Sequence, residues 1–234
     1  MKISILLPYK ENFSSSYAGA VSLLLNDTTK LSKFYNNIKI YGSTDFKRDL
    51  LSKKYINLPI RKFFFQSSTK IYLKKFITKE ISNPSKIIEI HNRPNYLNEI
   101  FKINPNIVLY FHNDPLHQKG SILKKERIDL LKKTRKIIFI SNWVKNRFFS
   151  DIKHLKKTTS NYIVIPHSID KVKIDINKKK NLIIFVGRLN SSKGYDIFGK
   201  AILEILTKHN DWKAIVYGDE PREKITFKHK NLKI

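Results

Sequence analysis

Two basic residues and two glycines occur where a hydrophobic run gives way to an amphipathic stretch, in FVGRLNSSKG at positions 185–194. Arg188 carries a planar, permanently charged guanidinium that suits phosphate oxygens, and Lys193 adds a second positive charge. Gly187 directly precedes the arginine, and the start of the following helix would itself favour an anion. The stretch therefore predicts a diphosphate site, and a solvated loop in a lysine-rich protein is the competing interpretation.

The dipeptide His-Asn occurs twice, each time after a hydrophobic run. HNRP (91–94) follows KIIEI, and HNDP (112–115) follows IVLYF. Histidine can donate or accept a hydrogen bond, or move a proton, near neutral pH. Either histidine could simply cap its loop, but the repetition favours a shared site. Neither spacing matches H-E-x-x-H, and no other tight His/Asp/Glu cluster occurs, so no metal site is predicted.

A third candidate lies near the amino terminus, where YKENFSSSYAGA (9–20) follows the first hydrophobic run. Gly19 would let backbone N–H groups and a helix N-terminus approach an anion. The spacing differs from G-x-G-x-x-G, so an NAD or FAD fingerprint is not indicated. An ordinary tight turn explains Gly19 equally well.

These residues need elements to position them, and short apolar runs alternate here with stretches of helical length. Most runs are continuous in Ile, Val, Leu and Phe, as expected of parallel strands buried on both faces. The predicted strands are 3–8, 38–42, 86–90, 106–111, 136–140, 162–166, 181–187 and 212–218. The predicted helices are 18–35, 67–81, 120–133, 142–149 and 195–208. The alternation predicts an α/β fold with doubly wound parallel sheets, whose ligands bind beyond the carboxyl ends of the strands.

The polar, lysine-rich segment 171–180 has little apolar periodicity and is predicted to be a linker. Two domains follow, at 1–172 and 178–234. The second has two clear strands and the beginning of a third at 231–234, which is few for a doubly wound domain. We therefore expect the second domain to be incomplete.

The chain is strongly basic: 46 Lys and Arg against 19 Asp and Glu give a net charge of +27. Such a balance favours polyanionic partners such as nucleic acid, anionic lipid or phosphorylated substrates, although a compositional bias towards lysine would give the same charge. There is no cysteine, and no run has the length of a signal peptide or a membrane span. A soluble, cytoplasmic protein is expected.

VGRL-x3-KG followed by an amphipathic helix resembles the donor-phosphate motif of retaining glycosyltransferases of family 4, which have the GT-B fold of two Rossmann-like domains. Other segments are similar to that family in order and spacing: IPHSID (165–170), FISNWVKNRF (139–148), FHNDP (111–115), HNRPNYL (91–97) and WKAIVYGDEP (212–221). The resemblance implies an N-terminal acceptor domain and a C-terminal nucleotide-sugar domain. No metal or resident cofactor is implied, since the nucleotide-diphosphate-sugar is a substrate.

The resemblance also implies roles for single residues. Arg188 and Lys193 would neutralise the donor diphosphate, with Gly187 and Gly19 shaping its surroundings and Gly218 near the nucleotide. His112 would contact the transferred sugar close to the reacting centre. The acceptor side would include the following residues: His91, Asn92, Arg93, Asn113 and Asp114.

The chain departs from the family pattern in three places. The paired glutamates of the family's E-x7-E motif would lie beyond Ile234, Gly19 stands between two alanines, and His167 replaces an asparagine. The expected activity is transfer of a sugar to a cell-surface glycan or a lipid-linked acceptor, with possible contact with an anionic membrane and no nucleic acid. The alternatives are a sugar-nucleotide epimerase or phosphorylase of the same fold, an inactive fragment, or a basic nucleic-acid-binding protein.

Overall fold

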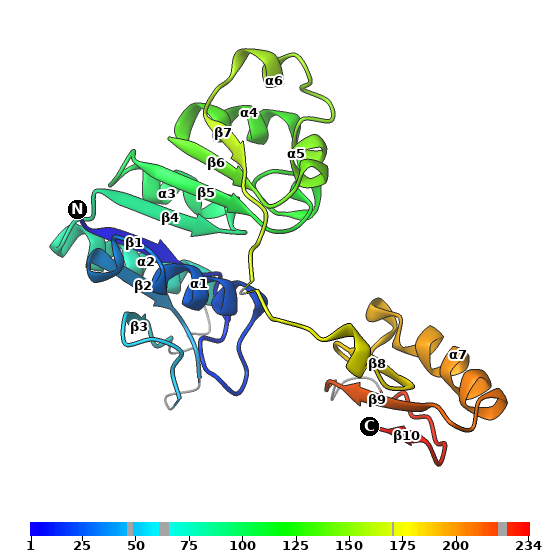
Figure 1. The fold of residues 1–234 in the computed structure, drawn as a ribbon. Helices are drawn as coiled ribbons and strands as arrows, with labels where there is room; N and C mark the ends of the chain where they lie inside the picture. Colours follow the sequence, from blue (N-terminus) through cyan, green and yellow to red (C-terminus); the bar gives the residue numbers. More distant parts are fainter. Residues whose placement is uncertain (46–48, 61–65, 170, 220–223) are drawn as a thin grey trace. The chain divides into compact units, whose positions relative to one another are not determined.

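The computed structural model describes residues 1–45, 49–60, 66–169, 171–219 and 224–234. The chain forms two compact units, Met1–Ile169 and Asp170–Ile234 (Figure 1). The sequence-based boundaries at 172 and 178 fall a few residues after this division. Both units are α/β with parallel sheets, as the alternating runs predict.

The first unit is built on a seven-stranded parallel sheet with the order β3-β2-β1-β4-β5-β6-β7. Its strands are β1 Ile3–Leu6, β2 Ile38–Gly42, β3 Tyr55–Asn57, β4 Ile87–His91, β5 Ile107–Phe111, β6 Lys136–Phe139 and β7 Tyr162–Val164. The strand order reverses between β1 and β4, because the chain builds outward to β3 and then crosses back. Ligands of open α/β sheets bind at such a switch point, beyond the carboxyl ends of the strands.

Helices cover both faces of this sheet unequally (Figure 1). α1 (Ala20–Lys30) packs on one face through Val21 and Leu25, against β1 and β2. The opposite face carries the larger core, which includes side chains of α2 (Ser68–Ser82), α3 (Leu97–Phe101), α4 (Lys124–Lys133) and α5 (Asn142–Phe148). The short helices are η1 Tyr35–Asn37, η2 Pro94–Tyr96, η3 Pro115–His117 and α6 Leu155–Thr158.

Strand alternation decides what faces α1. Ile88 and Ile90 of β4 are fully buried in the larger core. Because successive side chains of a strand point to opposite faces, Glu89 and His91 point to the α1 side of the sheet. Tyr110 of β5 lies beside His91 in the strand register and shares that side.

The second unit has a three-stranded parallel sheet with the order β10-β9-β8. Its elements are η4 Ile176–Lys178, β8 Leu182–Val186, η5 Ser191–Lys193, α7 Tyr195–Lys208, β9 Lys213–Tyr217 and β10 Leu232–Lys233. Ile202 and Leu206 of α7 pack on Ala214 of β9, as expected of the amphipathic helix predicted here. The other sheet face exposes large apolar side chains: Ile184 (51%), Val186 (76%) and Tyr217 (58%).

Differences from the sequence expectations are local. The helix predicted over 120–133 begins only at Lys124, because Gly120 is left-handed at φ 95° and the Glu126 carboxylate binds the N–H of Leu123. Ser141 caps α5, accepting from the N–H of Val144 at 3.2 Å. Within the described part of the chain, no helix is both long and apolar enough to cross a membrane.

Candidate functional site

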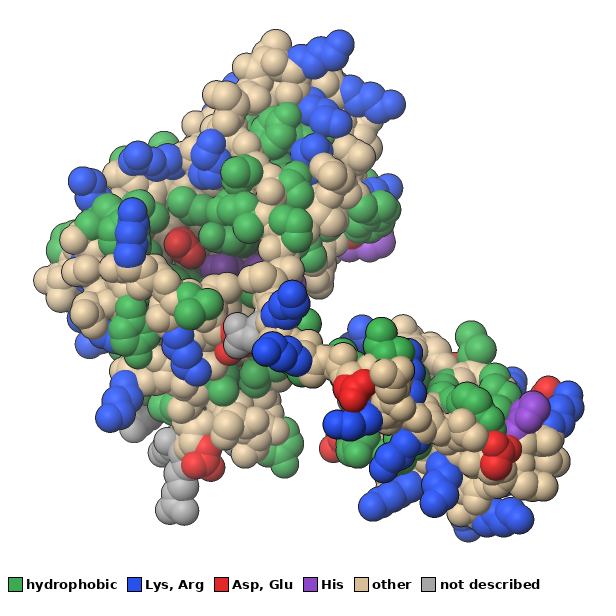
Figure 2. Space-filling model, in the orientation of Figure 1, with side chains coloured by type: hydrophobic (Ala, Val, Ile, Leu, Met, Phe, Trp, Pro, Cys, Tyr) green, Lys and Arg blue, Asp and Glu red, His purple; other side chains and the backbone are tan. Residues whose placement is uncertain are grey.

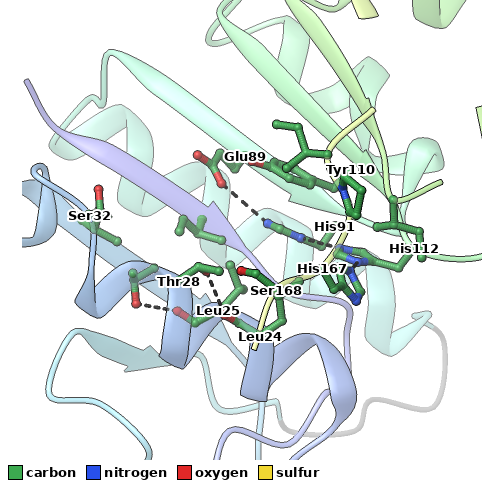
Figure 3. A pocket seen from close by; sticks show the side chains of 16 residues that line it. Leu24, Leu25, Thr28, Ser32, Glu89, His91, Tyr110, His112, His167 and Ser168 are labelled. Atoms are coloured by element: carbon green, nitrogen blue, oxygen red, sulfur yellow. Dashed lines mark hydrogen bonds and ion pairs between the residues drawn. The ribbon is translucent and has the colours of Figure 1, made fainter. Parts of the chain in front are cut away.

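Three histidines from separate segments meet at the carboxyl edge of the first sheet (Figure 3). His91 ends β4, His112 follows β5, and His167 comes three residues after β7. Nδ1 of His91 lies 2.9 Å from Nε2 of His112. Nδ1 of His112 lies 2.9 Å from Nε2 of His167. The predicted pair therefore comes together, and the third histidine extends it into a continuous chain.

A tyrosine and a glutamate contact His91, which forms the inner end of this row of three histidines. The His91 ring stacks on the ring of Tyr110, with centroids 4.5 Å apart and planes 13° apart. Among the described residues, Nε2 of His91 is buried without a hydrogen-bond partner, and the Glu89 carboxylate lies 3.7 Å from it. His91 and His112 are buried, whereas His167 is exposed. Solvent therefore reaches this chain at the His167 end.

His112 is held uncharged by its surroundings. Burial, together with the neighbouring His91 and His167, lowers the pKa of His112 to about 3. Burial and His91 also lower the pKa of His167. Both ring nitrogens of His112 are hydrogen-bonded to other histidines. A substrate atom can bind a His112 nitrogen only by displacing one of them.

Asn92 connects the two His-Asn loops. Its backbone is left-handed, with φ 51°, a conformation that asparagine tolerates better than most residues. Its side-chain oxygen accepts hydrogen bonds from the N–H of His112 at 2.7 Å and from Nε2 of Gln118 at 3.2 Å. Its own N–H donates to the carbonyl of Tyr110 at 2.9 Å. Asn92 is buried, and these hydrogen bonds hold the loops after β4 and β5 together.

The remaining predicted acceptor-side residues have different surroundings. Arg93 is half-buried, and its guanidinium donates to the carbonyl of Asn92 at 2.7 Å. Asn113 is exposed. Asp114 caps η3 and forms an ion pair with Arg147 at 2.9 Å. Burial alone would raise the pKa of Asp114, but hydrogen bonds from Arg147 and from the N–H of Leu116 outweigh it and lower this pKa. The Asp114 carboxylate is thus already engaged within the protein.

A pocket of about 300 Å³ runs from the histidines along the α1 face of the sheet. Leu24, Leu25 and Thr28 of α1 form one wall, with Glu89 and Tyr110 opposite (Figure 3). Figure 2 shows histidine and acidic side chains at the bottom of a hollow surrounded by hydrophobic ones. The described residues include no group of three or more His, Asp and Glu that could hold a metal ion.

Gly19 lies at the N-cap of α1, but a protein carboxylate occupies the space beside it. A Cβ at Gly19 would fall 2.0 Å from Oε1 of Glu11. The same oxygen accepts from the N–H of Ser22 in the first turn of α1, at 3.3 Å. The positive end of this helix is therefore already paired with an anion. A phosphate at Gly19 would compete with Glu11.

In the second unit, a compact turn places the two predicted cations at the carboxyl end of β8. The buried side chain of Asn190 caps η5, accepting from the N–H of Lys193 at 3.2 Å. Gly194 follows with φ 72°, in the left-handed region that favours glycine, and α7 begins at the next residue. Arg188 and Lys193 are both exposed. The turn thus presents two cations to solvent just before a helix N-terminus.

Two glycines stand back to back at the ends of β8 and β9. The N–H of Gly187 donates to the carbonyl of Tyr217 at 3.0 Å. A Cβ at Gly218 would fall 1.8 Å from the carbonyl oxygen of Gly187, so no side chain fits there. The two loops approach this closely only because position 218 is glycine. Glu220 and Pro221, the rest of the loop motif noted in the sequence, lie outside the described residues.

Sequence reasoning missed Glu89, Tyr110 and the place of His167 in the chain. Glu89 lies two residues before His91, so strand periodicity alone puts both side chains on one face. Tyr110 precedes His112 by the same interval. His167 too follows a strand, but in the sequence it stands out only as a departure from the family's asparagine. The two-residue periodicity of the strands is therefore enough to place Glu89 and Tyr110 beside the histidines, but not to reveal the contact made by His167.

Residues 167–233, nearly all of the second unit, match the family model described as glycosyl transferases group 1. That match includes the turn with Arg188 and Lys193. The search of curated proteins gave no match.

Solved structures of GT-B proteins resemble the chain in fold. One is the lipopolysaccharide outer core galactosyltransferase WaaB in its apo form, with 13% identity and a TM-score of 0.57, covering 94% of this chain and 62% of that one. Another is WaaG, a glycosyltransferase involved in lipopolysaccharide biosynthesis, with 14% identity and a TM-score of 0.58, covering 94% and 64%. A third is the UDP-GlcNAc 2-epimerase from Neisseria meningitidis, with 11% identity and a TM-score of 0.53, covering 95% and 67%. The chain therefore spans less than two thirds of the length of the first two, and it has the GT-B type of fold.

Proposed function

We propose that this chain is part of a glycosyltransferase that moves a sugar from a nucleotide-diphosphate-sugar to a glycan or lipid-linked acceptor, with retention and without a metal. The observation that carries the proposal is the group 1 match over residues 167–233, on a chain with the GT-B type of fold. The solved neighbours include two transferases of lipopolysaccharide synthesis, which supports a cell-surface acceptor.

The donor diphosphate binds at the turn after β8. Arg188 offers a fork of donors to phosphate oxygens, and Lys193 adds a point charge before the α7 N-terminus. Charge on the diphosphate grows as the glycosidic bond breaks, so two fixed cations lower the barrier by stabilising the leaving group. Gly187 and Gly218 keep side chains away from the nucleotide. The departing phosphate takes the acceptor's proton, so no protein base is needed.

The first unit supplies the sugar and acceptor contacts. The chain of His91, His112 and His167 lies where ligands of such sheets bind. His112 acts on the sugar through this chain, because both of its nitrogens are engaged by histidines. Arg93 and the exposed Asn113 flank the acceptor, while Asn92 and Asp114 hold their loops in place. A role for Gly19 in phosphate binding requires the Glu11 carboxylate to leave the α1 N-terminus.

The test uses UDP as a probe of the donor site. Binding of UDP to the 234-residue chain is measured by calorimetry for wild type, Arg188→Ala, Lys193→Ala and the control Lys200→Ala, an exposed lysine on α7. Each of the first two substitutions should weaken binding at least tenfold, since each removes a charge-assisted hydrogen bond. In a transferring enzyme, loss of one such donor costs on the order of 10²–10³ in rate. Equal affinities for all four proteins would contradict the assignment.

A second function is favoured by one observation, the likeness to a UDP-GlcNAc 2-epimerase. An epimerase changes the sugar of its substrate without consuming an acceptor. Incubation with a UDP-sugar alone separates the two functions: conversion of the sugar without an acceptor supports epimerisation, and dependence on an added glycan supports transfer.

The proposed setting is cytoplasmic, with contact with an anionic membrane surface. Four lysines of α2, at positions 70, 74, 75 and 79, line a groove with Leu58 and Pro59. Basic clusters of this kind are attracted to anionic headgroups. Flotation with vesicles of phosphatidylcholine, with and without phosphatidylglycerol, tests the idea, and equal recovery from both would contradict it.

A further inference from the structure

We propose that Glu89 sets the direction of the hydrogen bonds through His91, His112 and His167, so that His167 presents a bare Nδ1 lone pair to a sugar hydroxyl. Glu89 and His91 are then positioning residues, and His167 is the residue that touches substrate. The proposal deepens the proposed function and rests on it only for the identity of the ligand.

Each of the two contacts between the histidine rings holds one hydrogen. The two contacts join ring nitrogens 2.9 Å apart, a normal hydrogen-bond distance. One nitrogen of each contact must carry the hydrogen while the other offers its lone pair. A neutral imidazole has one of each, so the choice at one ring fixes the choice at the next. His112 is neutral, since burial lowers its pKa to about 3. The hydrogen bonds through the three rings can therefore run in either of two directions. The surroundings of His91 and of His167, at the two ends of the row, decide between them.

The inner end favours one direction. If the hydrogen of His91 were on Nδ1, its Nε2 lone pair would face the Glu89 carboxylate at 3.7 Å, without any donor. If the hydrogen is on Nε2, it points towards that carboxylate, and the buried nitrogen gains an electrostatic partner. An unsatisfied buried polar atom costs stability, so the second arrangement is preferred. His91 then accepts from Nε2 of His112.

The outer end follows from the inner one. Because Nε2 of His112 carries its hydrogen, Nδ1 of His112 must accept, and Nε2 of His167 must donate to it. That leaves Nδ1 of His167 as an acceptor. His167 is exposed at the carboxyl edge of the sheet, while the other two rings are buried. A sugar hydroxyl can donate to this nitrogen, because a hydroxyl carries one hydrogen to give.

Neighbouring residues hold the three histidine rings in the positions that these hydrogen bonds require. Tyr110 stacks on His91 and restricts its rotation, and Asn92 holds the main chain of His112. His112 and His167 are also in ring contact, with centroids 5.1 Å apart. The arrangement is therefore built before any substrate arrives, which reduces the entropy cost of binding.

The experiment reads the tautomers directly. The 234-residue chain is labelled with ¹⁵N-histidine, and long-range ¹H–¹⁵N spectra assign the protonated nitrogen of each ring at pH 7.5. Wild type should have hydrogen on Nε2 of His91, His112 and His167. Glu89→Leu should reverse or mix these tautomers, and the matched control Glu99→Leu, at an exposed glutamate of α3, should not. Wild type with Nδ1–H on the three rings overturns the proposal without any variant, as does a Glu89→Leu protein with unchanged tautomers.

Ligand binding tests the outer end separately. UDP and three UDP-sugars (glucose, galactose and N-acetylglucosamine) are titrated into wild type and His167→Ala. The substitution should weaken the tightest UDP-sugar roughly tenfold and leave UDP unchanged, since only the sugar loses a hydrogen bond. Equal weakening of both ligands, or of neither, overturns the sugar contact. Absence of UDP binding in wild type counts against the proposed function, whereas the tautomer spectra still decide whether Glu89 directs the chain.

Discussion

The side-chain oxygen of Asn92 accepts a 2.7 Å hydrogen bond from the main-chain N–H of His112. The residue that follows β4 therefore fixes the residue that follows β5. Asn92 achieves this in a left-handed backbone conformation at φ 51°. One residue thus supplies both the sharp turn and the link between the loops, and its two contributions can be separated by substitution.

Asn92→Ala and Asn92→Gly should destabilise the chain to different extents. Both lose the hydrogen bond to His112, worth about 0.5–1.5 kcal/mol. Alanine also has to adopt a left-handed backbone, at a further cost of roughly 1–2 kcal/mol, which glycine avoids. Urea unfolding measures the two free energies. Equal losses would show that the backbone at position 92 is unstrained.

Acid should destabilise the first unit through its histidines. The pKa of His112 is lowered to about 3 in the folded chain, against about 6.5 when unfolded. Between these values the unfolded state binds more protons, so the free energy of unfolding falls as the pH falls, by at most about 1.4 kcal/mol per pH unit for this residue. The lowered pKa of His167 acts in the same direction. The free energy of unfolding is measured with denaturant at several pH values from 7.5 to 4.5. It should depend less steeply on pH for His112→Asn than for wild type. An equally steep dependence would exclude His112 as the cause of the acid sensitivity.

Arg127 should be among the most sensitive positions of the fold. It is 1% exposed, donates to the carbonyls of Ser121 at 3.0 Å and Ile122 at 2.6 Å, and pairs with Asp151. Arg127→Met preserves bulk but leaves both carbonyls without this donor, which should cost about 2–4 kcal/mol. The exposed neighbour Lys125→Met serves as the control in thermal unfolding. Similar melting temperatures for the two variants would contradict a structural role for the guanidinium.

Gly218→Ala should disturb the second unit more than Gly194→Ala. A Cβ at position 218 meets the Gly187 carbonyl at 1.8 Å, which forces the ends of β8 and β9 apart. At position 194 none of the described residues places an atom within 4 Å of the new Cβ, so only the left-handed backbone costs energy, about 1–2 kcal/mol. Binding of UDP should be lost in the first variant and kept in the second. If UDP binding were instead kept in Gly218→Ala and lost in Gly194→Ala, the nucleotide would not bind near Gly218.

The larger elements of the fold could be predicted because hydrophobic periodicity depends on local sequence alone. Each of the eight predicted strands overlaps an observed one, with β4 reaching one residue further to His91, and α7 has the predicted limits, 195–208. β3 was missed, since three residues, Tyr55–Asn57, are too few to form a pattern. α1 was predicted to extend from 18 to 35 but spans only Ala20–Lys30, because the chain turns into η1 before β2.

The candidate site was predictable in position but not in detail. Strand ends locate His91 and His112 at one edge of the sheet, because parallel strands end together. The contact with His167 depends on the path of the chain after β7, where the N–H of Ile165 still pairs with the carbonyl of Phe139 at 2.9 Å. Likewise, the carboxylate of Glu11 beside Gly19 arises from a loop conformation that no motif encodes.

The open face of the second sheet has a practical consequence. Ile184 and Val186 lie on one side of β8, and Tyr217 pairs with Val186 in the register and shares that side. Water wets such a row of large apolar groups poorly, and sulfate ions strengthen the tendency of apolar surfaces to come together. The purified chain should therefore begin to salt out at a lower ammonium sulfate concentration than a Val186→Thr variant. The rise in light scattering with ammonium sulfate concentration measures this difference.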